Sequence, residues 1–176
     1  MDGLSAVIGV MSDTHGNRAL MFRAADTMLG RFGAGRIIHL GDDWRDITEL
    51  EAAGYPVWGV PGLWCDEYAN RARRVRTETA AGVRLCFAHS LADAERERSG
   101  AHILLFGHTH EAELGEEGGA LYMNPGHLKR AVDRDERASF GIVTLTPKRV
   151  VLSIHEDGGE QRVERHVSRR SLKAWP

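Results

Sequence analysis

The stretch AVIGVMSDTHG, residues 6–16, decides the fold class of this 176-residue chain. Its first part, Ala6–Met11, is apolar on both faces, which is typical of a strand covered from both sides in an α/β sheet. Beyond the loop, apolar residues at helical spacing predict a helix that begins after the N-cap Asn17 and ends at Gly30. The loop between them holds an aspartate and a histidine, so reactive groups stand at the carboxyl end of a buried strand.

The same alternation of strand, loop and helix continues along the chain. The loop GDD, residues 41–43, follows an apolar run and precedes a helical segment that Asp43 caps. Ser90 with Asp93 resembles a capping box before another helix. Later apolar segments alternate with turns and predict antiparallel strands. The remaining strands are expected at residues 36–40, 56–60, 82–90 and 102–110, the remaining helices at 43–54 and 91–99, and the antiparallel segments at 120–126, 139–147 and 149–156.

Length and composition limit the class of protein. A chain that is 42% hydrophobic and 27% charged suits one globular domain over residues 1–176, and no linker or repeat divides it. The formal charge of −2 argues against a polyanion binder, so the basic runs at 71–76 and 165–173 are interpreted as solvated faces rather than a nucleic-acid surface. Two cysteines are too few for a disulfide framework. Without a signal peptide or a membrane-length apolar run, we expect a cytoplasmic location and no membrane partner.

Charged or imidazole groups follow five of the predicted strands, in the motifs SDTH, GDD, CDE, AHS and GHTH. Ligands of open α/β sheets bind at the carboxyl ends of strands, so these groups are expected to meet at one edge. Asp13 and His15 lie two residues apart, as do His108 and His110, and in an extended segment each pair would point to one side and face one ion. Carboxylates with neutral imidazoles favour Mn, Fe or Zn over Ca or Mg. The other histidines are interpreted as surface, hydrogen-bonded or core residues: His39, His102, His127, His155 and His166.

The order of these motifs resembles a known family. SDTHG (12–16), HLGD (39–42), AHS (88–90), GHTH (107–110) and NPG (124–126) occur in the order of the calcineurin-like metallophosphoesterases, and the sequence is most similar to their small YfcE-like subfamily. The resemblance extends from about Ala6 to the final strands. It implies a four-layer α/β/β/α sandwich with mixed sheets and a dinuclear metal site at one edge.

The resemblance also implies a role for each motif residue. Asp13, His15 and His110 resemble the ligands of a first metal, and Asp42 resembles the carboxylate that bridges two metals. His89 and His108 resemble ligands of the second metal. Two divalent ions, with Mn first and Fe, Zn or Ni as alternatives, would lower the pKa of a bridging water, and the resulting hydroxide would attack a phosphoester.

The loop VPGLWCDE, residues 60–67, departs from the family pattern. Relatives place Gly-Asn-Cys-Asp here, with the Asn carbonyl on the second metal, whereas this chain has Leu63 and Trp64 after the glycine. Water, Cys65 or Asp66 could fill the vacancy, the second metal could be lost, or the site could serve binding instead of turnover. Cys65 replaces the histidine that acts as general acid in the wider superfamily, so Cys65 and Asp66 are the candidate catalytic residues. A weak acid favours stable leaving groups, hence a phosphodiester.

The substrate is expected to be a small-molecule phosphoester. Trp44 and Trp64 follow strand ends, where an aromatic face would stack on a nucleobase, although packing over the edge of the core is the commoner role of such a tryptophan. Asn124 and Gly126 of the NPG motif are further candidate substrate-binding residues. The alternative is a scaffold, like the retromer subunit that shares this fold but has lost metal-site histidines. Six of the usual seven ligand side chains remain here, which favours the enzyme; the sequence does not indicate an oligomeric state.

Overall fold

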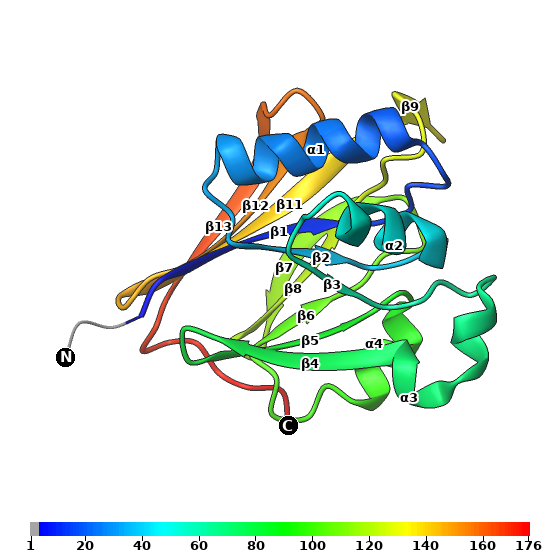
Figure 1. Ribbon diagram of the computed structural model, residues 1–176. Helices are drawn as coiled ribbons and strands as arrows, with labels where there is room; N and C mark the ends of the chain where they lie inside the picture. Colours follow the sequence, from blue (N-terminus) through cyan, green and yellow to red (C-terminus); the bar gives the residue numbers. More distant parts are fainter. Residues whose placement is uncertain (1–3) are drawn as a thin grey trace.

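The computed structural model describes residues 4–176 and arranges them as two β-sheets packed face to face (Figure 1). The first sheet has six strands in the order β13-β12-β11-β1-β2-β3, and the second has five in the order β4-β5-β6-β8-β7. The first sheet contains β1 (Ala6–Met11), β2 (Arg36–His39), β3 (Val57–Gly59), β11 (Ser139–Leu145), β12 (Arg149–Glu156) and β13 (Gln161–Ser168). The second contains β4 (Val75–Ala80), β5 (Val83–Ala88), β6 (Ile103–Leu105), β7 (Ala112–Glu117) and β8 (Ala120–Pro125).

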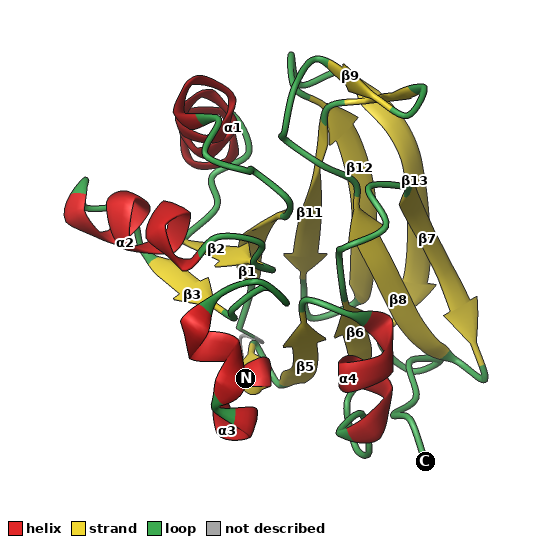
Figure 2. Cartoon of the chain, turned by 90° about the vertical axis from the view of Figure 1, so that its right-hand side faces the viewer, coloured by secondary structure: helices red, strands yellow, loops and turns green. Residues whose placement is uncertain are grey.

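Helices cover the outer faces of both sheets. In Figure 2, α1 (Arg18–Gly30) and α2 (Trp44–Ala52) lie beside the first sheet, and α4 (Leu91–Arg96) lies against the second. Shorter elements are the 3-10 helix η1 (Asp66–Ala69), α3 (Arg71–Arg74) and the hairpin β9 (Val132–Asp133) with β10 (Glu136–Arg137). Both sheets are mixed, since β1 is parallel to β2 and antiparallel to β11, while β8 is parallel to β6 and antiparallel to β7. The predicted α/β/β/α sandwich with mixed sheets is confirmed.

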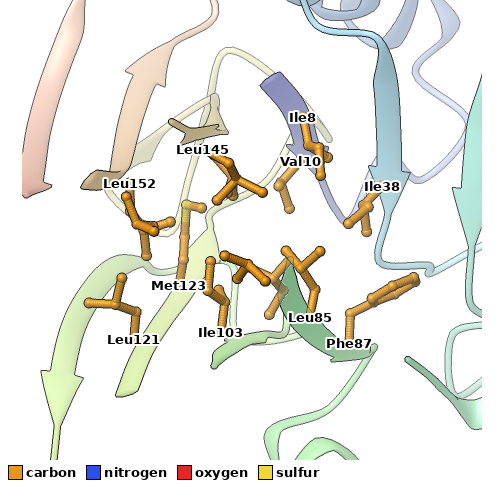
Figure 3. Close-up of a cluster of buried hydrophobic side chains, with 14 of the residues drawn as sticks. Ile8, Val10, Ile38, Leu85, Phe87, Ile103, Leu121, Met123, Leu145 and Leu152 are labelled. Atoms are coloured by element: carbon orange, nitrogen blue, oxygen red, sulfur yellow. The ribbon is translucent and has the colours of Figure 1, made fainter. Parts of the chain in front are cut away.

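Burial explains why the first strand is apolar on both faces. Ile8 and Val10 point into the core between the sheets, where they meet Leu85 and Phe87 of β5 (Figure 3). Met11 faces the opposite way and packs in the cluster beneath α1 and α2. Successive side chains of a strand alternate between its faces, and here both faces are covered. Burying one such large side chain stabilises the fold by about 1.5–3 kcal/mol.

The predicted helix signals are confirmed, and several strand predictions need correction. Asn17 accepts a hydrogen bond from the Leu20 amide and caps α1, while Asp43 and Ser90 cap α2 and α4. The segment 120–126 was expected to be an antiparallel strand; β8 is antiparallel to β7, as expected, but it also pairs in parallel with β6. The sequence analysis did not identify α3, β4, β7, the β9–β10 hairpin or β13, because their short or polar segments lack a strong apolar period. No helix within residues 4–176 is long and apolar enough to cross a membrane.

Candidate metal centre

The loops after β1, β2, β5 and β6 bring five of the six predicted metal ligands together. Their potential ligand atoms form two groups, each with all atoms within 4.8 Å of one another: Asp13 with His15 and His110, and Asp13 with Asp42 and His89. Asp13 belongs to both groups. The resemblance assigned the bridging position to Asp42, and that role stays a prediction.

Direct contacts link the two groups. His15 Nδ1 lies 2.8 Å from Asp42 Oδ2, and His15 Nε2 lies 3.1 Å from His110 Nε2. His110 Nε2 also lies 3.3 Å from Asp13 Oδ1. Imidazole nitrogens and carboxylate oxygens therefore lie close together. This combination of ligand atoms is the donor set of a transition-metal site.

His108, the sixth predicted ligand, belongs to neither group. Its backbone amide donates to Asp13 Oδ2 at 2.9 Å, and its ring centroid lies 5.2 Å from that of His89. The side chain stands at the exposed rim of the site. His108 and His110 therefore do not face one point as a pair.

The backbone at the site is not extended, contrary to the expectation for the pairs in SDTH and GHTH. The φ angles are 54° at Asp13, 46° at His15, 126° at Asp42, 74° at His108 and 68° at His110, all in the left-handed region. Residues other than glycine rarely adopt such angles, and the strain costs about 1–3 kcal/mol each. Tight loops, and not strand pleating, bring these side chains together. Their concentration in one place is typical of a functional site.

His89 is held in the tautomer that a metal ligand requires. Its Nδ1 donates to the Leu40 carbonyl oxygen at 2.9 Å, so Nε2 carries a free lone pair. Nε2 is buried and has no hydrogen-bond partner within residues 4–176. An orphaned lone pair in the interior is unfavourable unless a cation or a donor meets it. The residues present therefore fit a divalent metal beside His89, Asp13 and Asp42.

Asp133 fixes the orientation of His110. The Nδ1 atom of His110 donates to Asp133 Oδ2 at 2.7 Å, and both side chains are only 6% exposed. The other oxygen, Oδ1, accepts from Arg130 at 3.0 Å and lies 3.5 Å from Lys129 Nζ. A carboxylate behind a histidine commonly orients a metal ligand in this way. The sequence analysis missed Asp133 because its segment, KRAVDRDER, is as charged as a solvated turn.

The two carboxylates of the second group have opposite pKa shifts. Burial raises the pKa of Asp13, but hydrogen bonds from His110 and Ser12 and the nearby His89 together outweigh it and bring the pKa to about 2. Burial raises the pKa of Asp42, and the negative charge of Asp13 acts in the same direction. A cation between them would remove this repulsion.

The loop VPGLWCDE is anchored to the loop after β2. The Cys65 thiol donates to the Asp42 carbonyl oxygen at 2.7 Å and accepts from the Trp44 amide at 3.1 Å. Burial raises the pKa of Cys65, so the thiol keeps its proton. Cys65 is in neither ligand group, Asp66 is exposed at the start of η1, and Trp64 is 87% exposed. Trp64 therefore does not pack over the edge of the core, the commoner role of such a tryptophan. The catalytic roles of Cys65 and Asp66 stay predictions.

Two glycines allow these loops to approach each other. A Cβ added to Gly62 would overlap the backbone of Asp42, and one added to Gly107 would meet Asp13 Oδ2 at 2.8 Å. Contacts under 3.0 Å with backbone force the chain apart. The loop therefore needs glycine at position 62, whereas a side chain at position 107 would displace the Ser12 and Asp13 side chains.

The NPG motif supports the GHTH loop from behind. Asn124 donates to the Gly107 carbonyl oxygen at 3.2 Å and to Thr109 Oγ1 at 2.9 Å, and its own oxygen accepts from the Gly126 amide. These bonds occupy the side chain of Asn124 with the protein itself. Its substrate-binding role, like that of Gly126, stays a prediction.

Of the roles expected for His127, the structure shows a buried, hydrogen-bonded residue and not a surface one. Its ring is fully buried beside His110, with ring centroids 5.4 Å apart, and its Nε2 donates to the Glu136 carbonyl oxygen at 3.0 Å. The β9–β10 hairpin folds over this position. His39 is buried as expected, accepting from the Gly41 amide at Nδ1 and contacting Thr14 through Nε2.

Comparisons with known proteins agree with this geometry. Residues 7–148 match the calcineurin-like phosphoesterase superfamily domain. A predicted phosphoesterase of Streptococcus pneumoniae TIGR4 is 20% identical, with a TM-score of 0.71 over 94% of this chain and 98% of that one. Vps29 of Entamoeba histolytica complexed with zinc is 18% identical, with a TM-score of 0.64 over 92% and 98% of the chains. An archaeal phosphodiesterase is 18% identical, with a TM-score of 0.61 over 92% and 99%. No curated protein matches the chain.

Two facing mixed sheets with imidazoles and carboxylates at one edge define a metal-dependent phosphoesterase fold. The chain belongs to the calcineurin-like phosphoesterase superfamily, whose domain covers most of its length. The solved structures are too distant in sequence to show more than this fold.

Proposed function

We propose that the chain is a divalent-metal-dependent phosphoesterase that prefers phosphodiesters. The observation that carries this proposal is the orphaned Nε2 of His89, buried beside Asp13 and Asp42. The other ligand group, Asp13 with His15 and His110, supports two ions instead of one. The donor set suits Mn first, with Fe, Zn or Ni as alternatives.

The residues of the chain would hold the ions and leave one side open to substrate. Divalent cations bound there would lower the pKa of the attacking water and neutralise charge on the phosphoryl oxygens. Asp13, Asp42 and the buried histidines provide the fixed charge and the lone pairs that hold them. His15 and His108 are exposed at the rim, where a phosphoryl oxygen can reach their rings.

The preference for diesters follows from the weak general acid. Cys65 donates its proton to the Asp42 carbonyl oxygen, and no neutral histidine occupies its place in the loop. Leaving groups that need protonation should therefore leave slowly. A phosphodiester or an activated aryl ester, with a more stable leaving group, should therefore react faster than a simple alkyl phosphate.

The proposed substrate is a small phosphoester with a nucleotide-like part, in a cytoplasmic setting. Trp64 exposes most of its indole to solvent beside the site, and Trp44 starts α2 two residues after Asp42. Stacking of a base on an aromatic face contributes about 1–3 kcal/mol. An exposed indole so near the ligands supports a base-binding role.

The test is hydrolysis of bis-p-nitrophenyl phosphate with added Mn²⁺, with p-nitrophenyl phosphate as the monoester comparison. We expect the diester to react faster, no turnover in EDTA, and near-complete loss of turnover in Asp42→Asn. Asp157→Asn, which removes a distant surface carboxylate paired with Arg23, should keep full activity. Metal-independent turnover, or full activity in Asp42→Asn, would contradict the proposal.

A scaffold role is the second candidate. It is favoured by Leu63 and Trp64, which replace the asparagine ligand, and by the similarity of the fold to Vps29 structures. The same assay separates the two functions. A folded protein that hydrolyses neither ester with Mn²⁺, Zn²⁺, Ni²⁺ or Fe²⁺ would favour the scaffold.

A further inference from the structure

An arginine-lined cleft lies outside the candidate metal centre. It occupies ≈ 670 Å³ between α3 and α4. Pockets that hold small ligands commonly measure about 300–1,000 Å³. The polar and charged residues that line it are Arg71, Arg74, Thr77, Asp93, Arg96 and Glu97.

The cleft lies beside the second sheet, at the end of the sheet from which the metal-site loops extend. Val75 pairs with Ala88, so α3 enters β4 at the point where β5 leads into His89 and α4. Figure 1 shows α3 and α4 together at this end. On the other side, the Arg73 guanidinium lies 5.9 Å from the ring of Trp44, close to the Asp42 loop. The α3 helix therefore contacts the residue two positions after Asp42, and α4 begins two residues after His89.

Arg74 presents a pre-organised guanidinium to this cleft. Its Cζ atom lies 4.0 Å from the Tyr68 ring centroid, and Nε donates to the Tyr68 carbonyl oxygen at 2.7 Å. The Tyr68 hydroxyl in turn donates to the buried Asp93. Within residues 4–176, the two terminal amino groups of Arg74 make no hydrogen bond or ion pair. A guanidinium already held in position binds an anion with less loss of side-chain entropy.

Asp93, the buried acidic residue of the lining, does not neutralise Arg74. Asp93 already accepts from Ser90, Tyr68 and Arg96. Arg71 has no carboxylate within ion-pair distance in the described chain and is exposed on α3. Planar guanidinium groups with free N–H donors match the oxygens of a phosphate.

We propose that the α3–α4 cleft binds a second phosphate group of the substrate, one that is not cleaved. The inference rests on the proposed phosphodiesterase function and specifies its substrate class. The preferred substrate is a phosphodiester that carries a further phosphate on its nucleotide-like part.

The test compares thymidine 5′-(p-nitrophenyl phosphate) with the same compound carrying a 3′-phosphate. In the wild type, the 3′-phosphate should lower KM. In Arg71→Glu, KM for the phosphorylated compound should rise about five- to tenfold, as expected for one partly exposed charge pair. KM for the unphosphorylated compound and kcat for both should stay unchanged. Arg71→Lys should keep most of the effect, and Arg170→Glu, an exposed arginine after β13, is the matched control.

Equal KM values for the two compounds in the wild type would overturn the inference, as would a rise for both in Arg71→Glu. A binding measurement separates this failure from failure of the proposed function. Metal-free protein in EDTA is titrated with inorganic pyrophosphate and followed by amide NMR shifts. We expect shifts in α3 and the first turn of α4, reduced in Arg71→Glu. If no shifts occur there, phosphate binding in the cleft is refuted even when hydrolysis is seen. If shifts occur without any hydrolysis, only the proposed enzymatic function is refuted.

Discussion

Asp133→Asn is expected to weaken metal binding by changing the tautomer of His110. In the native chain, one carboxylate oxygen of Asp133 accepts from His110 Nδ1 at 2.7 Å, and the other accepts from Arg130 at 3.0 Å. Asparagine has only one side-chain oxygen, which can accept from His110 or from Arg130 but cannot face both. Arg130 and the nearby Lys129 carry only donors, so they retain the amide oxygen and leave the NH2 group facing Nδ1. Nδ1 must then accept, and the proton moves to Nε2.

That proton blocks the atom that should bind the metal. His110 Nε2 lies 3.3 Å from Asp13 Oδ1, within the group that includes His15. Loss of such an outer carboxylate commonly reduces metal affinity about 10–100-fold. We expect a decrease of this size for one of two Zn²⁺ ions, measured by isothermal titration calorimetry. Imidazole nitrogen NMR shifts should report Nε2 protonation in the variant.

Asp157→Asn is the matched control, because its carboxylate pairs with Arg23 away from the site. It should bind both ions like the wild type. If Asp133→Asn stays folded and binds both ions with native affinity, the reasoning about the tautomer is refuted. Restored affinity on replacing Lys129 and Arg130 by methionine in the Asp133→Asn background would support it, since the amide oxygen could then turn to Nδ1.

Four further outcomes are expected. Burial lowers the pKa of His39 from 6.5 to about 4, so between these pH values the unfolded chain binds a proton at His39 that the folded chain does not. His39 should therefore lower the free energy of unfolding by roughly 1.4 kcal/mol for each pH unit as pH falls through that window, and urea titrations of His39→Gln should show a slope smaller by that amount. Gly62→Ala should destabilise the fold by about 1–3 kcal/mol, because its Cβ overlaps the Asp42 backbone, whereas Gly30→Ala, with open space around it, should not. Mn²⁺ at about 100 times its Kd should stabilise the wild type by about 2.7 kcal/mol in thermal unfolding and stabilise Asp13→Asn much less. Trp64→Ala should leave the free energy of unfolding within about 0.5 kcal/mol and raise KM for thymidine 5′-(p-nitrophenyl phosphate) more than for bis-p-nitrophenyl phosphate.

The fold was predictable because its central strands and helices carry strong local signals. The two-sided apolar run Ala6–Met11 and the caps Asn17 and Asp43 each follow from the sequence within a few residues. The edge strands β4 and β13 lack such signals, since β13 is exposed except at Val167 and no residue of β4 is fully buried. The parallel pairing of β8 with β6 depends on packing between distant segments, which local periodicity does not report.

The clustering of the candidate ligands was predictable from the sequence, and their geometry was less so. Motifs at strand ends identified Asp13, His15 and Asp42 as neighbours, because parallel strands end at one edge. The alternation of strand side chains did not predict their contacts, since these residues lie in left-handed loops. Asp133 was beyond prediction because it reaches His110 through a hairpin with no strong apolar pattern.

The altered loop VPGLWCDE is better understood as a change in the site than as damage to it. A loop released from selection on the metal centre would have no need for Gly62, whose missing side chain admits the Asp42 backbone. The Cys65 thiol further ties the loop to Asp42, a candidate ligand, through a hydrogen bond to its carbonyl oxygen. The substitution that removes the asparagine places Trp64 in solvent, at the approach to the ligands, where an indole gains nothing from the core. Together these contacts keep Asp42 in place and leave an aromatic surface exposed beside the candidate ligands, which is consistent with the phosphodiesterase proposed above.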